Sequence, residues 1–262
     1  MSQDALVLLK KFADGVAHLI FNHPPLNLMS ADFNRQLDRV LDEIAIDAGI
    51  RAVVVTGAGE KAFCAGSDIK EFPGLVREGT HITKKLDPEN QLLDKLSFLP
   101  QPTIAALNGV TLGGGGEVAL CCDLRIMGES GRIGFPEIKL GLFPGSGGLV
   151  RLPRLVGDSR AKELMFFGEL ITAHKALAIG LVNEVVPDGK IVERAHERAA
   201  QLANLSAQAI QAIKLGVNQV RDMPHQQGIR FSLELSRRIF LTDNAKEGIQ
   251  AFFEKRKPTF NA

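Results

Sequence analysis

The segment from Ile104 to Leu124, IAALNGVTLGGGGEVALCCDL, carries the strongest structural signal in this chain. A short apolar run ends at Asn108, and four consecutive glycines, Gly113 to Gly116, lead into a run that suits a helix. Glycines at a helix start leave backbone N–H groups accessible, and that end of a helix stabilises a bound anion or an oxyanion formed during a reaction. Close packing of the helix against another element also requires glycine, so both interpretations stay open.

A second glycine-rich segment, GFPEIKLGLFPGSGG from Gly134 to Gly148, contains an isolated carboxylate, Glu137, in apolar and proline-flanked sequence. Glu117 has similar surroundings, 20 residues earlier in the chain. A lone carboxylate is costly to bury, and a surface position is the ordinary alternative for each glutamate. Two carboxylates in such sequence instead predict a pair that divides into an ionised base and a protonated acid.

A third segment, GAGEKA from Gly57 to Ala62, matches the phosphate-binding turn of a dinucleotide fold. That fold also needs a helix starting in the turn and an acidic residue about 20 positions further on. The following residues, Phe63 to Asp68, contain another glycine and no periodic apolar face. We therefore interpret this segment as a flexible loop.

Strands and helices alternate over the first part of the chain, which predicts an α/β fold. The expected strands are residues 4–9, 16–21, 51–56 and 103–107, the first two being joined by a turn at 13–15. Ser30 is expected to cap a helix whose apolar face runs from Phe33 to Ile44. From about residue 189 onward only helical patterns remain, so we divide the chain into an α/β part, 1–188, and a helical part, 189–262.

Composition narrows the class of protein. The 262 residues include 31 basic and 30 acidic side chains, and there is no Trp or Tyr, so the balanced charge argues against a nucleic-acid-coating protein. Three cysteines fit neither a disulfide framework nor a zinc site, and four histidines that we inspected for metal-like spacing show none: His23, His81, His174 and His225. With no leader pattern at the start and no long apolar run, we expect a cytoplasmic protein without membrane or metal.

Four motifs in this order resemble the enoyl-CoA hydratase/isomerase (crotonase) superfamily over essentially the whole chain. They are KAFCAGSDI at 61–69, the stretch at 104–124, the stretch at 134–148, and ITAHKALAIGLVNEVV at 171–186. The resemblance implies a spiral of ββα units, followed by a helical C-terminal part that assembles the chain into trimers, often paired as hexamers. It also implies an acyl-CoA thioester as substrate, with coenzyme A belonging to the substrate and no separate cofactor.

The resemblance assigns roles to residues at matching positions. The backbone N–H groups of Ser67 and Gly114 would hold the thioester carbonyl as an oxyanion hole, where losing one donor costs about 10²–10³ in rate. Glu117 would orient and deprotonate water, Glu137 would protonate the α-carbon, and the backbone around Gly145, at a helix expected to start at Ser146, would hold that water. A nucleophilic Ser67 is the rival interpretation, and no histidine beside it in the sequence supports that role.

Coenzyme A brings phosphates, so a chain of balanced charge must present basic groups locally. Residues matching the family's CoA-contacting positions lie around the Ser67 turn and near the end of the chain: Lys61, Ala65, Asp68, Ile69, Phe252 and Lys255. The cations of residues 255–257 form a patch suited to phosphate, or an ordinary solvated helix end.

The presence of both glutamates favours an enoyl-CoA hydratase, which adds water across the 2,3 double bond of a 2-enoyl-CoA in fatty-acid β-oxidation or related acyl-CoA degradation. Other reactions of the superfamily remain alternatives, namely double-bond isomerisation, dehydration and hydrolysis, and so does an RNA-binding member, against which the charge and the missing Tyr and Trp weigh. Phe135, Phe143 and Gly116 depart from the common family pattern, and we expect them to reshape the acyl pocket. The segment 72–99, which often shapes the acyl site in this family, yields no prediction.

Overall fold

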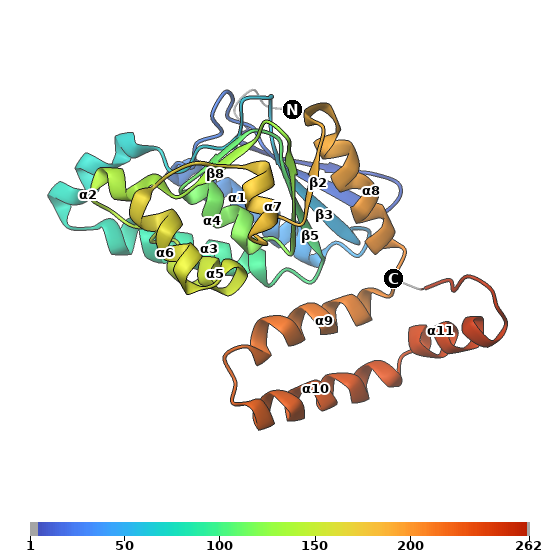
Figure 1. The fold of residues 1–262 in the computed structure, drawn as a ribbon. Helices are drawn as coiled ribbons and strands as arrows, with labels where there is room; N and C mark the ends of the chain where they lie inside the picture. The colour runs from blue at the N-terminus through green and yellow to red at the C-terminus, as the bar shows by residue number, and fades with distance from the viewer. Residues whose placement is uncertain (1–4, 261–262) are drawn as a thin grey trace.

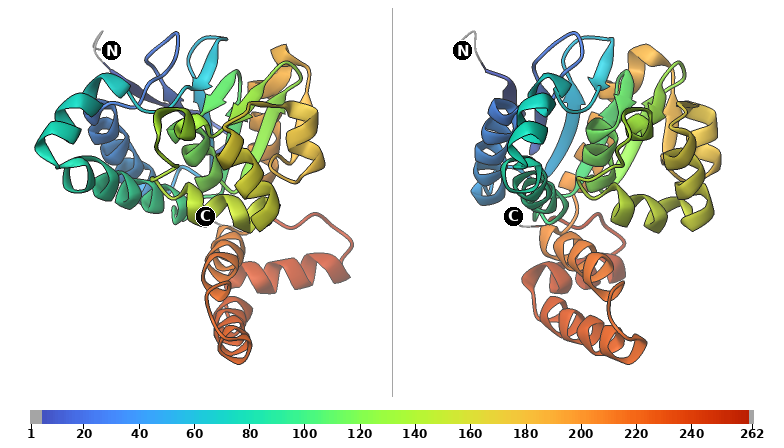
Figure 2. Two further views of the ribbon diagram at one scale, coloured as in Figure 1. Left: turned by 60° about the vertical axis from the view of Figure 1, so that its left-hand side comes forward. Right: turned by 90° about the vertical axis from the view of Figure 1, so that its left-hand side faces the viewer.

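The computed structural model describes residues 5–260, so residue 4 of the first expected strand lies outside the described residues. An α/β body forms most of the structure, and helices from the C-terminal part of the chain protrude from it (Figures 1 and 2). The body contains two β-sheets and the helices packed around them.

The larger sheet has six strands: β1 (Val7–Lys11), β2 (Val16–Phe21), β3 (Ala52–Gly57), β5 (Thr103–Leu107), β7 (Leu124–Gly128) and β10 (Glu184–Val186). Their order across the sheet is β1-β2-β3-β5-β7-β10, and only the β1–β2 hairpin is antiparallel. Every residue of β3 and β5 is buried, as expected for central parallel strands covered on both faces. The strands expected at 16–21, 51–56 and 103–107 are therefore confirmed.

The smaller sheet has four strands: β4 (Ala62–Cys64), β6 (Val110–Leu112), β8 (Arg132–Gly134) and β9 (Ile171–Thr172). β4, β6 and β8 are neighbours and run parallel, and β9 pairs antiparallel with β8. Consecutive strands alternate between the sheets, because β3, β5 and β7 of the larger sheet are each followed by a strand of the smaller one. Helical segments then lead to the next pair, which confirms the expected spiral of ββα units.

Helical segments fill the connections of the body. The α-helices are α1 (Ala31–Ile46), α2 (Phe72–Glu78), α3 (Asp87–Ser97), α4 (Gly114–Cys121), α5 (Gly148–Val156), α6 (Asp158–Phe167), α7 (Ala173–Ala178) and α8 (Ile191–Ala203). The short 3₁₀ segments are η1 (Ile69–Glu71), η3 (Pro136–Leu140) and η4 (Asp188–Lys190), and η2 (Ile82–Leu86) is π-helical. The Ser30 hydroxyl accepts a hydrogen bond from the Phe33 N–H at 3.2 Å, so the expected cap of α1 is confirmed.

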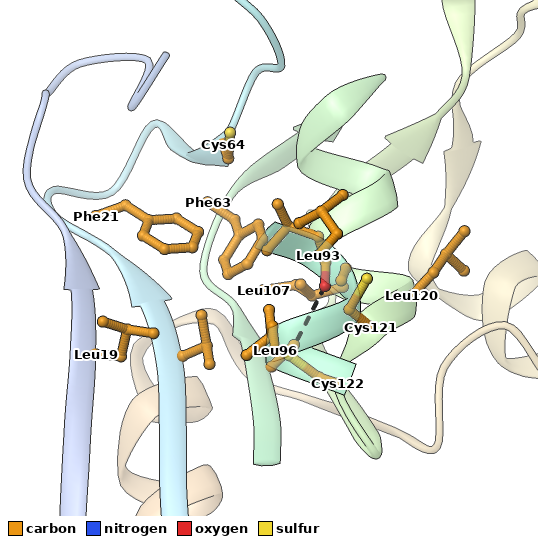
Figure 3. Close-up of a cluster of buried hydrophobic side chains, with 14 of the residues drawn as sticks. Leu19, Phe21, Phe63, Cys64, Leu93, Leu96, Leu107, Leu120, Cys121 and Cys122 are labelled. Atoms are coloured by element: carbon orange, nitrogen blue, oxygen red, sulfur yellow. Dashed lines mark hydrogen bonds between the residues drawn. The ribbon is translucent and has the colours of Figure 1, made fainter. Parts of the chain in front are cut away.

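The main hydrophobic core lies between the sheets and α1, α3 and α4. Phe21, Phe33 and Phe63 form a fully buried aromatic cluster there, with ring centroids 5.0 and 5.4 Å apart for the two pairs that involve Phe21. Figure 3 shows Phe21 and Phe63 beside leucines from α3 and β5. Cys121 and Cys122 are free and buried, in agreement with their expected role as small apolar residues.

The helical C-terminal part has two different environments. α8 lays Ala195, Ala199 and Ala203 against the outer face of the larger sheet and forms a second core with it. The remaining helices, α9 (Ala207–Val220), α10 (His225–Phe240) and α11 (Asp243–Phe253), protrude from the body (Figure 1). The division at residue 189 thus marks the end of the strands, whereas the packed body extends through α8.

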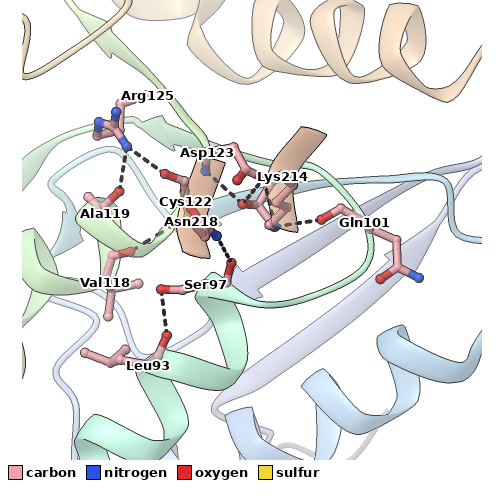
Figure 4. Close-up of polar contacts among 11 residues, drawn as sticks. Leu93, Ser97, Gln101, Val118, Ala119, Cys122, Asp123, Arg125, Lys214 and Asn218 are labelled. Atoms are coloured by element: carbon pink, nitrogen blue, oxygen red, sulfur yellow. Dashed lines mark hydrogen bonds and ion pairs between the residues drawn. The ribbon is translucent and has the colours of Figure 1, made fainter. Parts of the chain in front are cut away.

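An ion pair anchors the first protruding helix. Lys214 of α9 lies 2.9 Å from a carboxylate oxygen of Asp123 and donates a hydrogen bond to the Gln101 carbonyl at 3.0 Å (Figure 4). Asp123 also accepts hydrogen bonds from the Thr103 N–H and hydroxyl. This buried polar contact fixes α9 on the ends of β5 and β7.

Candidate active site

Three strands of the smaller sheet deliver the candidate residues to one edge. Because β4, β6 and β8 are parallel neighbours, their carboxyl ends meet at the same edge. Ser67 follows β4 by three residues, Gly114 follows β6 by two, and Glu137 follows β8 by three. Residues that are 70 positions apart in the chain are therefore brought together.

The four glycines at the start of α4 confirm one of the two interpretations that the sequence left open, close packing, and the anion-binding interpretation stays a prediction. A Cβ on Gly115 would overlap the Cys64 carbonyl, and one on Gly116 would lie 2.8 Å from the Phe135 ring, so both allow close packing. Gly113 has φ of 50°, which favours glycine, and it directly precedes the helix. Gly114 begins the helix, and its N–H has no carbonyl of α4 to which it can donate.

The backbone nitrogen of Ser67 lies close to the start of α4. A Cβ on Gly114 would be 3.5 Å from the Ser67 nitrogen. The Gly66 carbonyl and the Asp68 N–H both bond to the backbone of Met29, so the N–H of the intervening Ser67 points away from Met29. An oxyanion hole needs two neighbouring backbone donors, so the roles predicted for Ser67 and Gly114 stay predictions.

Glu117 lies in the first turn of α4 and is 3% exposed. One of its oxygens accepts a hydrogen bond of 2.8 Å from the Gly148 N–H at the start of α5. Burial raises the pKa of Glu117 to about 8, with smaller contributions from repulsion by Glu137 and Glu89, while the Gly148 hydrogen bond opposes the shift. A carboxyl held in this way exchanges its proton near neutral pH.

Glu137 approaches the same helix start from η3. Its Oε1 would lie 2.9 Å from a Cβ on Gly113, and its Oε2 is buried with no hydrogen-bond partner among the described residues. Burial raises the pKa of this carboxyl as well. Two carboxyls thus lie around the α4 N-terminus, and burial displaces both toward the protonated form, so the expected division into an ionised base and a protonated acid stays a prediction.

The turn from Gly145 to Gly148 differs from the expectation in one respect. The helix predicted to start at Ser146 begins at Gly148, because Gly147 has a φ of 97° and ends the turn in a left-handed conformation. Gly145 lies beside Leu86, and its carbonyl accepts from Asn90. The hydrogen bond to Glu117 comes from Gly148, which the sequence analysis did not single out.

Sequence reasoning also missed Glu89. This residue of α3 is 1% exposed, and its carboxylate accepts a hydrogen bond of 2.6 Å from the Ser146 hydroxyl. It lies in the segment 72–99, where no motif marked it, and its partner is 57 residues away. The third buried carboxylate became visible only through tertiary packing.

Two of the three residues that depart from the family pattern, Gly116 and Phe135, compensate each other in size. Phe135 is fully buried, and its ring occupies the space that a side chain at position 116 would need. Phe143 is instead exposed, at the surface after η3. The predicted effect of these residues on the acyl pocket stays a prediction.

The six residues matched to CoA contacts fall into two groups. Lys61, Ala65, Asp68 and Ile69 surround the Ser67 turn, and Asp68 caps η1 through the Lys70 N–H. Phe252 and Lys255 lie on and just after α11, which both views in Figure 2 show below the body and away from α4. Within one chain, the structure does not bring the second group to the first.

Neither a cluster of potential metal ligands nor a helix able to span a membrane occurs among the described residues. In residues 5–260, no three His, Cys, Asp or Glu side chains converge as a metal site would require. Over the same range, every helix is too short or too polar to traverse a bilayer.

Comparison with known proteins places this geometry in a family. The family model for enoyl-CoA hydratase/isomerase matches residues 11–262. The short-chain-enoyl-CoA hydratase of Clostridium acetobutylicum is 39% identical over 92% of both chains. The crotonyl-CoA hydratase of Syntrophomonas wolfei is 32% identical over 99% of both.

The solved structures agree. A crystal structure of the enoyl-CoA hydratase from Bacillus anthracis superposes with a TM-score of 0.93 at 36% identity, covering 98% of this chain and 99% of that one. Sequence and fold together show that the chain belongs to the enoyl-CoA hydratase/isomerase family.

Proposed function

We propose that this protein is an enoyl-CoA hydratase that adds water across the 2,3 double bond of a 2-enoyl-CoA thioester. The observation that carries the proposal is the pair of carboxyls with raised pKa, buried Glu117 and half-buried Glu137, at a helix start close to the Ser67 backbone nitrogen. Hydratases among the relatives of this chain support the choice of reaction.

The proposed reaction gives each of these groups a distinct role. The thioester carbonyl oxygen accepts hydrogen bonds from the Ser67 and Gly114 N–H groups, which stabilise the charge that develops on it. Glu117 removes a proton from water as the water oxygen bonds to C3, and the electrons of the double bond move toward the carbonyl. The enolate then returns its electrons to C2, which takes the proton of Glu137. Transfer of a proton from Glu117 back to Glu137 restores the starting state.

The test is hydration of crotonyl-CoA by the Glu117→Gln and Glu137→Gln variants, with Glu129→Gln, an exposed glutamate, as the matched control. Each active-site variant should lose roughly 10²–10⁴ in kcat, because each removes one proton transfer, while the control should match the unmodified protein. Mass spectrometry of the product should show the addition of one water, whereas an unchanged mass would indicate isomerisation. Turnover by either active-site variant at the unmodified rate would contradict the mechanism.

We further propose assembly into trimers, alone or paired as hexamers. Large apolar side chains are exposed along the protruding helices, including Leu233, Phe240, Phe252 and Phe253, and burying them against another chain would remove apolar surface from water. In such an assembly Phe252 and Lys255 would reach the CoA of a neighbouring subunit. Sedimentation should give a mass of three or six chains, and a monomer would refute the assembly.

The setting that we propose is the cytoplasm and the degradation of fatty acids or related acyl groups, with no cofactor beyond the CoA of the substrate. Cys64, Cys121 and Cys122 are all free, which supports a reducing compartment. Hydration at an unchanged rate after extensive dialysis against a chelator would support metal-independent chemistry, and loss of activity restored by one metal would contradict it.

A further inference from the structure

The Glu89 carboxylate is buried in α3 with an unusually complete set of partners. One oxygen accepts from the Ser146 hydroxyl at 2.6 Å, and the other accepts from the Asn34 amide and from the Lys85 ammonium, both at 3.1 Å. The side chains of Lys85 and Glu89 are only 10% and 0% exposed. Because a buried charge is costly unless it is paired and hydrogen-bonded, this arrangement is a built polar site.

The contact with Ser146 connects Glu89 to the catalytic carboxyl. Ser146 lies two residues before Gly148, whose N–H donates to Glu117 at 2.8 Å. The Ser146 hydroxyl therefore ties the turn that carries this donor to a charged group on another element. Moving the turn would lengthen or misalign the hydrogen bond that the Glu117 side chain accepts from Gly148.

Other contacts from α3 secure the same turn. The Asn90 amide donates to the Gly145 carbonyl at 3.0 Å. The Arg151 guanidinium donates to the Ser146 carbonyl at 3.1 Å and forms an ion pair with Asp94 of α3. Helix α3 thus contacts the turn at Gly145 through Asn90 and at Ser146 through Glu89, and Asp94 holds the Arg151 side chain that contacts the Ser146 carbonyl.

The charges around Glu117 come from several elements. Glu137 approaches from η3 and Glu89 from α3, and both disfavour the ionised form of Glu117. Lys85 of η2 balances Glu89, and Arg151 of α5 contacts the turn next to Gly148. The net field at Glu117 therefore depends on whether the pair of Lys85 and Glu89 is intact.

We propose that the Lys85–Glu89 ion pair is a positioning element of this active site. Through Ser146 it holds the Gly148 N–H against Glu117, and its charge balance sets the pH at which Glu117 loses its proton. The inference rests on the proposed hydratase function, since that function makes Glu117 the base.

Three variants separate charge from position. Glu89→Gln removes a negative charge near Glu117 with little change of shape, so the Glu117 proton should be lost at lower pH. Lys85→Met leaves the Glu89 charge unbalanced and should have the opposite effect. Ser146→Ala keeps both charges and removes only the contact with the turn. Lys84→Met is the matched control, because Lys84 is exposed and pairs with Glu78 at the surface.

The assay is kcat/KM for crotonyl-CoA hydration as a function of pH. The limb at low pH should shift down by roughly one pH unit in Glu89→Gln and up by a similar amount in Lys85→Met. Ser146→Ala should lower kcat roughly tenfold with a smaller change in KM, and Lys84→Met should follow the unmodified protein. The double variant Lys85→Met/Glu89→Gln should return the limb toward its original position, which also covers the case in which one single variant folds poorly.

A second readout does not require turnover. Carbon NMR of protein labelled at glutamate carboxyls, with the Glu117 signal assigned by its loss in Glu117→Gln, should show the same opposite shifts of titration. If the unmodified protein does not hydrate enoyl-CoA, the proposed function fails while the NMR titration still tests the ion pair. If hydration proceeds but the pH profiles and titrations of the variants coincide with those of the unmodified protein, the positioning role is overturned.

Discussion

Replacing Glu117 with glutamine should stabilise the protein in a way that depends on pH. The carboxyl is 3% exposed, and its burial raises the pKa from the ordinary value of 4.5 to about 8. The folded chain therefore holds this proton more tightly than the unfolded chain does. Glutamine has nearly the same shape, keeps an oxygen for the Gly148 N–H, and does not titrate.

The sign and size of this effect on the free energy of unfolding follow from the linkage between proton binding and folding. With the folded pKa above the unfolded one, the stabilisation from the protonated carboxyl is fully present below about pH 4.5 and is lost as the pH rises toward 8. The loss amounts to about 3 kcal/mol at neutral pH and about 5 kcal/mol above pH 8. Relative to its value below about pH 4.5, the advantage of Glu117→Gln over the unmodified protein in free energy of unfolding should therefore grow by these amounts.

Urea unfolding over a series of pH values measures this difference, at one fixed protein concentration because assembly contributes to stability. Glu129→Gln, at the surface, should give a difference that is constant within about 0.5 kcal/mol. A flat profile for Glu117→Gln would refute the reasoning, because it would mean that burial does not perturb this carboxyl.

Three further outcomes are expected. Ser67→Ala should keep crotonyl-CoA hydration within about threefold of the unmodified rate, since the backbone N–H is the active group, and a loss of about 10⁴ would instead favour a nucleophilic hydroxyl. Gly116→Ala should lower the free energy of unfolding by about 1–3 kcal/mol in urea, because its methyl group meets the Phe135 ring, and the double variant Gly116→Ala/Phe135→Leu should recover part of the loss. Lys255→Met should raise KM for crotonyl-CoA but not for crotonyl-pantetheine, which lacks the nucleotide phosphates; equal effects on both would argue against a phosphate contact.

The candidate site residues that lie within short glycine- or proline-rich segments could be predicted from the local sequence. Glu117 directly follows the glycines that start α4, and Glu137 lies in a proline-flanked apolar stretch, so their unusual surroundings are visible in the sequence. The strands at 51–56 and 103–107 were predicted for a similar reason, since buried parallel strands read as continuous β-branched or apolar runs.

The parts that were not predicted depend on distant contacts. Glu89 follows an aspartate, a proline and no motif, and its burial results from the packing of α3 on a turn 57 residues away. The position of the α5 start was set by the left-handed Gly147 rather than by Ser146, which is an equally plausible cap by type. α8 looks like the helices after it in composition, and only its small-residue face reveals that it packs on the sheet.

The origin of the site in three adjacent strands has an evolutionary consequence. Neighbouring strands in a sheet are about 4.8 Å apart, so the backbone sets a ruler between the Ser67 turn, the start of α4 and η3. A residue inserted in the loop of one ββα unit lengthens that loop and leaves the spacing between the strands unchanged. Such a scaffold can acquire a new reaction by exchanging the side chain at one strand end, while the backbone that we propose to bind the thioester carbonyl keeps its position. Diversification by single substitutions, without redesign of the binding frame, is therefore built into the winding of the chain.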